Sequence, residues 1–299
     1  MQTTVLLKCA SQLGLIVSLS ACQGLEGMQI QGVDLGKLAS AGQHLTNMGQ
    51  KSVDEERVIG QNTASILLNK AAVLNNPPLQ TYVNRVGLWV AQHSERPDLP
   101  WRFVVLDSPQ VAAYAAPGGY VFITSGMLTR MNSEAELAGV LAHEVAHVVQ
   151  QHHLKAIQQQ AQTDLLTDLA TLAVQAGAAD KGGSQAGELT DRFTRSVSDL
   201  YSRGLDRGDE YEADAMGAVI ATRAGYDAYG LAGVLQTLGT TRQNDAALTS
   251  FLKVHPGIDD RLQRLQRLQP VYLYIEKNAS GQTQSLDTRY QQALRDPLK

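Results

Sequence analysis

Residues 142–147 read Ala-His-Glu-Val-Ala-His and contain the pattern H-E-x-x-H. Residues four apart on a helix lie one above the other on the same face, so His143 and His147 can point two imidazole nitrogens at one ion. Glu144 follows His143 by roughly 100° of rotation, so its carboxylate lies beside the pair and not on the same face. A carboxylate in that position can take a proton from a metal-bound water. This stretch therefore predicts a metal site with its own general base.

The residues on both sides of the pattern favour a buried helix. Ser133 followed three residues later by Glu136 is typical of a capping box, with Asn132 as an alternative cap. The positions that follow are apolar on nearly all sides, which predicts a core helix continuing through Gln151 and towards Gln162. Polar groups buried in such a helix need partners, and a metal supplies them. The alternative is that these are two ordinary core histidines with a coincidental spacing.

Composition narrows the class of protein. The chain has 299 residues, 43% hydrophobic and 18% charged, which is ordinary for a globular protein. The net charge of −4 and the lack of a long basic run make nucleic acid an unexpected partner. The 2 cysteines, Cys9 and Cys22, both lie near the start. A metal site in the remaining chain must therefore use histidines and carboxylates.

Residues 1–21 have the features of a lipoprotein signal peptide. The apolar stretch over residues 13–19 is too short to span a bilayer, and it leads into Leu-Ser-Ala ahead of Cys22. This ending resembles the bacterial lipobox, which implies that Cys22 carries several acyl chains and anchors the protein stably. Gln23, in place of Asp, resembles a signal for the outer membrane. The alternative is an ordinary cleaved secretory signal with an incidental cysteine.

The rest of the chain divides into three predicted segments. Residues 22–52 read as a lipidated tether with a short helix, and residues 53–270 as a metallopeptidase domain. Residues 271–299 read as a strand followed by a polar tail. No role is predicted for that tail.

A small antiparallel sheet is predicted just before the metal helix. Residues 101–106 and 120–124 have the pattern of strands, and Pro-Gly-Gly at 117–119 is a turn signal between them. The free edge of such a sheet can add a substrate peptide as a further strand. The candidate substrate-binding residues are therefore Tyr120, Val121 and Phe122, although the sheet could equally serve only to cover the helix.

An acidic stretch further along the chain offers a third ligand. Residues 208–217 open a helix predicted to end at a Gly225 C-cap, with Glu210 and Asp214 on one face. Glu210 would complete a two-His, one-Glu zinc site with an open position for water. Asp214 would accept the outer ring N–H of His143. The alternative is that acids gather here only because they favour a helix N-terminus.

Three further side chains near these stretches are expected to point away from the ion. Helical spacing turns His152 and His153 off the face that carries the ligands, so both are predicted to face solvent. Glu212 lies between Glu210 and Asp214 but on another face of its helix, and it is predicted to be solvated.

H-E-x-x-H followed by a distant E-x-x-x-D resembles the gluzincin metallopeptidases of family forty-eight, and among them the compact bacterial lipoprotein type. The likeness extends over roughly residues 50–270 and includes Pro-Gly-Gly-Tyr-Val-Phe at 117–122, Tyr-Ser-Arg at 201–203 and His-Pro at 255–256. It implies a zinc endopeptidase in which His255 gates the zinc or helps polarise the substrate carbonyl.

These observations predict an α+β, mostly helical, zincin-like domain with one zinc ion, held by His143, His147 and Glu210, and with Glu144 as general base. The resemblance and the lipobox imply a periplasmic protein on the outer membrane that degrades unfolded or misassembled envelope proteins. The outer-membrane protein assembly machinery is then a candidate partner. Two alternatives stay open: a chaperone-like assembly factor with a latent zinc site, and a non-catalytic lipoprotein scaffold.

Overall fold

The computed structural model describes residues 29–30, 33–34, 53–161, 185–240, 245–255 and 257–268. The chain divides into two units, one of residues 1–49 and 167–181, the other of residues 50–166 and 182–299. In the first unit, β1 (Gln29–Ile30) pairs antiparallel with β2 (Val33–Asp34). The signal peptide, Cys22 and the strand expected after residue 270 lie outside the described residues.

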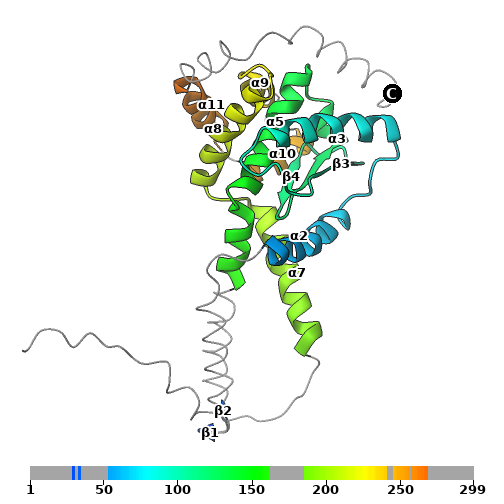
Figure 1. The fold of residues 1–299 in the computed structure, drawn as a ribbon, viewed down its shortest axis with the longest axis vertical. Coiled ribbons are helices and arrows are strands. Elements are labelled where there is room, and N and C mark those ends of the chain that lie inside the picture. The colour runs from blue at the N-terminus through cyan, green and yellow to red at the C-terminus, as the bar shows by residue number, and fades with distance from the viewer. Residues whose placement is uncertain are drawn as a thin grey trace, which may run out of the picture. The chain divides into compact units, whose positions relative to one another are not determined.

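The second unit is mostly helical, as the sequence predicts, and includes a three-stranded sheet (Figure 1). Its elements are α2 (Val53–Leu68), α3 (Pro77–Gln92), β3 (Arg102–Leu106), β4 (Ala113–Ala116), β5 (Tyr120–Thr124), α4 (Ser125–Leu128), α5 (Glu134–Val149), α7 (Gln185–Arg203), α8 (Arg207–Arg223), α9 (Gly230–Thr240), α10 (Ala246–Val254) and α11 (Ile258–Arg267). Residues 152–161 are also helical. Among the described helices, none combines the length and the apolar character that a membrane span requires.

The sheet has the strand order β3-β5-β4 and is mixed. β5 runs antiparallel to β4 and parallel to β3. The predicted antiparallel pairing of residues 101–106 with residues 120–124 is therefore wrong, because β3 and β5 run parallel. The sequence analysis missed β4, which precedes β5 in the chain and is joined to it by a tight turn at Gly118 and Gly119, both with positive φ. Because β4 takes one side of β5 as its hairpin partner, β3 pairs on the other side and runs parallel.

Both outer strands have polar groups covering their free edges. On β3, the side-chain amide of Gln80 in α3 bonds to the N–H (3.0 Å) and the C=O (2.8 Å) of Val105. On β4, the Tyr201 hydroxyl of α7 donates to the carbonyl of Ala115 at 2.6 Å. Unprotected edges recruit further strands, so these bonds close the sheet against unwanted pairing.

α5 lies at the centre of this unit, where it contacts α3, α8, α9 and β4 (Figure 1). Ser133 Oγ accepts a hydrogen bond from the Glu136 N–H at 3.1 Å, which confirms the predicted cap. The Glu136 carboxylate in turn accepts from the N–H of Asn132. The crossing with α8 is close at Gly217, where a Cβ would lie 2.8 Å from the backbone nitrogen of His143. A larger residue at this position would push the two helices apart.

α5 ends earlier than the sequence predicts. The helix stops at Val149, and Gln151 adopts φ +59°, the left-handed conformation. A second helical segment then begins at His152. The prediction of one continuous helix was wrong because apolar periodicity continues across a single left-handed residue without marking it. The predicted end of α8 is confirmed, since Gly225 follows it with φ +86°.

Candidate metal centre

α5 places two imidazoles opposite each other, as their spacing predicts. His143 Nε2 and His147 Nε2 lie 3.1 Å apart, and the two rings are perpendicular. The exposed fractions of these residues are 3% and 0%. Their nitrogens therefore meet inside the protein, away from bulk water.

α8 brings a carboxylate to the same point. Glu210 Oε2 lies 3.6 Å from His143 Nε2, and Glu210 Oε1 lies 3.5 Å from His147 Nε2. Glu210 belongs to the first turn of α8 and is buried. The fold thus brings together the three side chains that the sequence predicts as ligands, from two helices that are far apart in the sequence.

A fourth donor comes from the residue that ends α10. The Nδ1 atom of His255 lies 2.8 Å from Glu210 Oε2. One ligand atom from each of His143, His147, Glu210 and His255 lies within 4.8 Å of the others, and all four residues are buried. His255 therefore offers a fourth donor atom beside the three predicted ligands.

Glu144 lies buried beside this group. Its Oε2 atom has no hydrogen-bond partner among the described residues. Burial raises the pKa of Glu144, and it outweighs the opposite effect of His255 and His143. A carboxylate with a raised pKa and a free oxygen is suited to accept and return a proton near neutral pH.

The outer nitrogen of His143 faces a buried ion pair. Asp214 Oδ1 lies 3.0 Å from His143 Nδ1, and Arg261 binds both oxygens of Asp214, at 2.8 Å and 2.6 Å. Burial opposes ionisation of Asp214, but Arg261 outweighs it and lowers the pKa of Asp214 to about 2. Arg261 Nη1 also lies 3.3 Å from Glu210 Oε2.

The sequence analysis assigned no role to Arg261. A signal was present, because Arg261 lies on the apolar stripe of α11, between Ile258 and Leu265. A charged residue on the buried face of an amphipathic helix must find a buried partner.

The charges of the donors suit cation binding. Burial lowers the pKa of His147 to about 3, so its ring is neutral at pH 7 and keeps a lone pair. Burial also opposes ionisation of Glu210, yet His255 and His147 hold the pKa of that carboxyl well below its usual range. The Glu210 carboxylate in turn raises the pKa of His255, against burial. The site therefore places the neutral ring of His147 beside a carboxylate, Glu210, that is already ionised.

The expectation that His152 and His153 face solvent was wrong. Both are buried, and His152 Nδ1 lies 2.9 Å from His147 Nδ1. His153 stacks on Tyr201 with 4.8 Å between ring centroids. The left-handed Gln151 changes the direction of the chain, so spacing counted along α5 no longer applies beyond it. Glu212 is 65% exposed, as expected, but its Oε2 lies 3.5 Å from His152 Nε2.

The expectation that Tyr120, Val121 and Phe122 add a substrate strand does not fit the sheet. These residues belong to β5, the central strand, whose main chain already pairs on both sides. A peptide could pair only with an outer strand. On β4, the Ala115 carbonyl that such a peptide would use is bound by Tyr201.

The donor set fits a divalent metal, and zinc in particular. Two or three imidazoles and one carboxylate, all buried, are typical of zinc sites in proteins. Glu210 Oε1 is buried without a hydrogen-bond partner among the described residues. A cation between the imidazoles and this oxygen would relieve that unsatisfied atom.

Comparisons with known proteins agree with this site. The sequence profile of Peptidase family M48 matches residues 77–269. The chain is 28% identical over 219 residues to a putative beta-barrel assembly-enhancing protease of Vibrio cholerae, covering 71% of this chain and 43% of that protein. It is 27% identical over 213 residues to the beta-barrel assembly-enhancing protease of Escherichia coli K12, with the same coverage.

The chain is also similar to a mitochondrial protein. The chain is 26% identical over 193 residues to the mitochondrial metalloendopeptidase OMA1 of Schizosaccharomyces pombe, covering 64% of this chain and 54% of that protein. The chain thus spans less than half the length of the bacterial relatives and about half of this one. The match to the family profile covers well over half of the chain and includes the four clustered donors. The chain therefore belongs to peptidase family M48.

Proposed function

We propose that this chain is a zinc-dependent endopeptidase. The observation that carries the proposal is the meeting of His143, His147, Glu210 and His255 at one buried point, with Glu144 beside them. Membership of family M48 and the names of the relatives support it. Sequence spacing selects His143, His147, Glu144 and Glu210, and the family resemblance adds His255, so the clustered residues are those that the sequence predicts for this chemistry.

Each residue of the site has a separate proposed role. His143, His147 and Glu210 would hold the ion. Zinc bound there would lower the pKa of a coordinated water to about 7 and polarise the carbonyl of the substrate. Glu144 would take a proton from that water and pass it to the leaving amine. The raised pKa of Glu144, which burial causes, favours this return of the proton.

His255 would occupy the place of the water in the closed form. It contacts Glu210 at 2.8 Å and is itself buried, so a substrate carbonyl has no access until His255 moves. His255→Ala tests this role by its cleavage rates on folded and unfolded substrates. A faster rate supports a gate, a slower rate supports help in polarising the carbonyl, and an unchanged rate on both substrates rejects both roles.

We further propose that the enzyme acts on unfolded or misassembled envelope proteins, anchored by lipid on Cys22 to the periplasmic face of the outer membrane. The support is the lipobox-like Leu-Ser-Ala before Cys22 and the names of the two bacterial relatives. The protein assembly machinery of the outer membrane is the candidate partner. Membrane fractionation of wild type and Cys22→Ser tests the anchor, since the variant should become soluble.

Glu144→Gln is the central experiment. We expect the variant to keep one zinc per chain and to lose cleavage by a factor of about 10² to 10⁴, as expected for removal of a general base. Glu95→Gln, on an exposed surface pair with Arg223, is the matched control and should cleave normally. Wild-type protein without bound zinc would reject the proposal outright.

A chaperone-like assembly factor is the second candidate, and the closed, fully buried site favours it. The same variant separates the two functions in cells. If Glu144→Gln fully complements a deletion strain, binding is the function that matters. If it fails to complement while its zinc content is normal, cleavage is required.

A further inference from the structure

The outer nitrogen of His147 has an unusual partner. Nδ1 of His147 lies 2.9 Å from Nδ1 of His152, and both rings are buried. His143, one turn earlier on α5, instead faces the carboxylate of Asp214 at 3.0 Å. The two proposed imidazole ligands therefore have different supports, one an acid and the other a second histidine.

Proton positions follow from this contact if His147 binds an ion. A nitrogen that coordinates a metal carries no proton, so a neutral His147 bound through Nε2 carries its proton on Nδ1. That N–H can only donate, so the nitrogen that it meets, His152 Nδ1, must accept. His152 must then carry its own proton on Nε2. The contact thus fixes the tautomers of both rings.

The far side of His152 is arranged to favour this tautomer. Two carboxylates of α8 lie near its Nε2 atom, Asp209 Oδ1 at 3.7 Å and Glu212 Oε2 at 3.5 Å. Neither forms a hydrogen bond with Nε2, but their negative charges favour a proton on this atom. These acids are 35% and 65% exposed, whereas the ring of His152 is almost wholly buried. A row of polar groups therefore leads from the ion site, through two rings, to the surface. α8 contributes to both ends of this row: Glu210 lies at the proposed ion site, and Asp209 and Glu212 lie at the surface.

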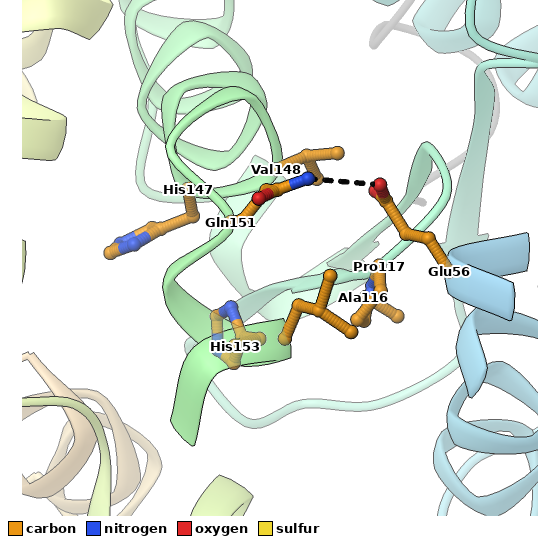
Figure 2. A pocket seen from close by; sticks show the side chains of 8 residues that line it. Glu56, Ala116, Pro117, His147, Val148, Gln151 and His153 are labelled. Atoms are coloured by element: carbon orange, nitrogen blue, oxygen red, sulfur yellow. Dashed lines mark hydrogen bonds between the residues drawn. The ribbon is translucent and has the colours of Figure 1, made fainter. Parts of the chain in front are cut away.

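The backbone holds His152 in place. Gln151 adopts φ +59°, a conformation that is costly for a residue with a side chain and is typically kept only where the surroundings impose it. Its side-chain amide donates to Glu56 Oε2 at 3.2 Å (Figure 2). Glu56 is buried and also binds Arg96. Figure 2 shows Gln151 turned towards Glu56 and away from His147. The next residue, His152, contacts His147 at 2.9 Å between their Nδ1 atoms.

We propose that His152 is a positioning residue for the metal site: it accepts the Nδ1–H of His147 and so keeps His147 Nε2 free and oriented for the ion. This rests on the proposed function, because it assumes that His147 is a ligand. Loss of a partner of this kind typically lowers metal affinity about 10- to 100-fold. The same support should also hold the ring of His147 in one orientation.

Zinc affinity of four proteins tests the proposal, measured by competition with a chromophoric chelator. His152→Leu removes the acceptor and should weaken zinc binding about 10- to 100-fold. His152→Asn has nearly the same shape as the leucine variant, and its Oδ1 can accept from His147, so its affinity should recover to within about threefold of wild type. His153→Leu is the matched control, because the His153 Nδ1 atom lacks a hydrogen-bond partner among the described residues. It should bind zinc nearly as wild type does.

A measurement on the wild-type protein needs no variant to fold. Long-range proton–nitrogen NMR spectra of the zinc-loaded protein should show His152 protonated on Nε2 and His147 on Nδ1. A His152 protonated on Nδ1 would overturn the proposal, as would equal zinc affinity of the leucine and asparagine variants. Zinc binding by wild type with unchanged affinity in His152→Leu rejects only this inference. Failure of wild type to bind zinc rejects the proposed function itself.

Discussion

The two histidines of α5 that we propose as ligands, His143 and His147, are one turn apart and both buried, but the groups that contact their outer nitrogens differ. Behind His143 lies Asp214, held by two hydrogen bonds from a fully buried arginine, Arg261. Behind His147 lies a neutral ring, His152, which leads to exposed acids. His143 is therefore supported by a buried ionic network, whereas His147 is supported by a neutral ring that leads to acidic side chains at the surface.

This difference follows from the charges that the site must hold. Glu210 and Asp214 are two buried carboxylates on one face of α8, and burying two anions together requires a cation. Arg261 contacts both of them and offsets one of the two negative charges, so the metal-free site keeps a net negative charge that attracts a cation. On the other side His152 is neutral, and no further charge has to be compensated. The network of Arg261, Asp214 and Glu210 should therefore contribute more to the unfolding free energy than the contact between His147 and His152.

Removal of Arg261 should have the largest effect. Arg261→Met keeps the length of the side chain but leaves Asp214 and Glu210 buried without their cation. Breaking a buried pair in this way typically costs about 3–5 kcal/mol of unfolding free energy. Urea unfolding of the zinc-free protein measures it.

Arg223→Met is the matched control, because Arg223 pairs with Glu95 at the surface, where both side chains are more than 40% exposed. An exposed pair contributes at most about 1 kcal/mol. Equal losses in the two variants would mean that the ionic network behind His143 does not stabilise the fold.

The two sides should respond to acid in different pH ranges. Arg261 holds the pKa of Asp214 at about 2, below its usual 3.8, so Asp214 contributes stability above about pH 4 that is lost as pH falls towards 2. Burial lowers the pKa of His147 to about 3 and also lowers that of His152. Below about pH 6.5 these two histidines are protonated in the unfolded chain but not in the folded one. Their contribution to the unfolding free energy therefore decreases as pH falls below 6.5.

The unfolding free energy decreases by about 1.4 kcal/mol per pH unit for each histidine that stays neutral in the folded state. His255 acts in the opposite direction, because Glu210 raises its pKa, so its contribution is present below pH 6.5 and is lost above its raised pKa. Burial also lowers the pKa of His153, so three histidines with lowered pKa values act against Glu144, whose pKa burial raises, and we expect a net loss of unfolding free energy as pH falls from 6.5 to 5. Urea unfolding of protein treated with a chelator measures this curve. A flat curve in that range would contradict the neutral state of the His147 side.

Sequence reasoning succeeded where rules within one helix decide. The spacing of His143 and His147, the Ser133 cap of α5 and the glycine after α8 depend on neighbours within four residues. The placing of Glu210 needed only one further assumption, that an acidic helix end would pack against α5.

Sequence reasoning failed where the structure depends on a single residue or on pairing with a strand that was not predicted. β4 is four residues long and mostly alanine, so it lacked the β-branched pattern that marks a strand, and the sheet order could not be read without it. His152 was misplaced because one left-handed residue, Gln151, changes the direction of the chain. Glutamine gives no local sign of that conformation, which glycine or asparagine would have indicated.

Gln151 therefore offers the smallest and most selective test of the difference between the two sides. Gln151→Gly removes the strain of φ +59° but loses the hydrogen bond to Glu56 and adds freedom to the unfolded chain. These terms nearly cancel, so the unfolding free energy should change by less than about 1 kcal/mol. Zinc affinity should stay within threefold of wild type, because glycine keeps His152 in place.

Gln151→Val is the informative partner of that variant. A β-branched residue strongly resists a positive φ, so the chain must either bear a cost of about 1–3 kcal/mol or move His152 away from His147. Relaxation would weaken zinc binding on the His147 side while the Asp214–Arg261 network stays intact. Chelator competition and urea unfolding, run on both variants, separate the two responses. If the valine variant matches the glycine variant in both measurements, the left-handed turn has no part in supporting His147, and the support must come from the packing of the second helical segment alone.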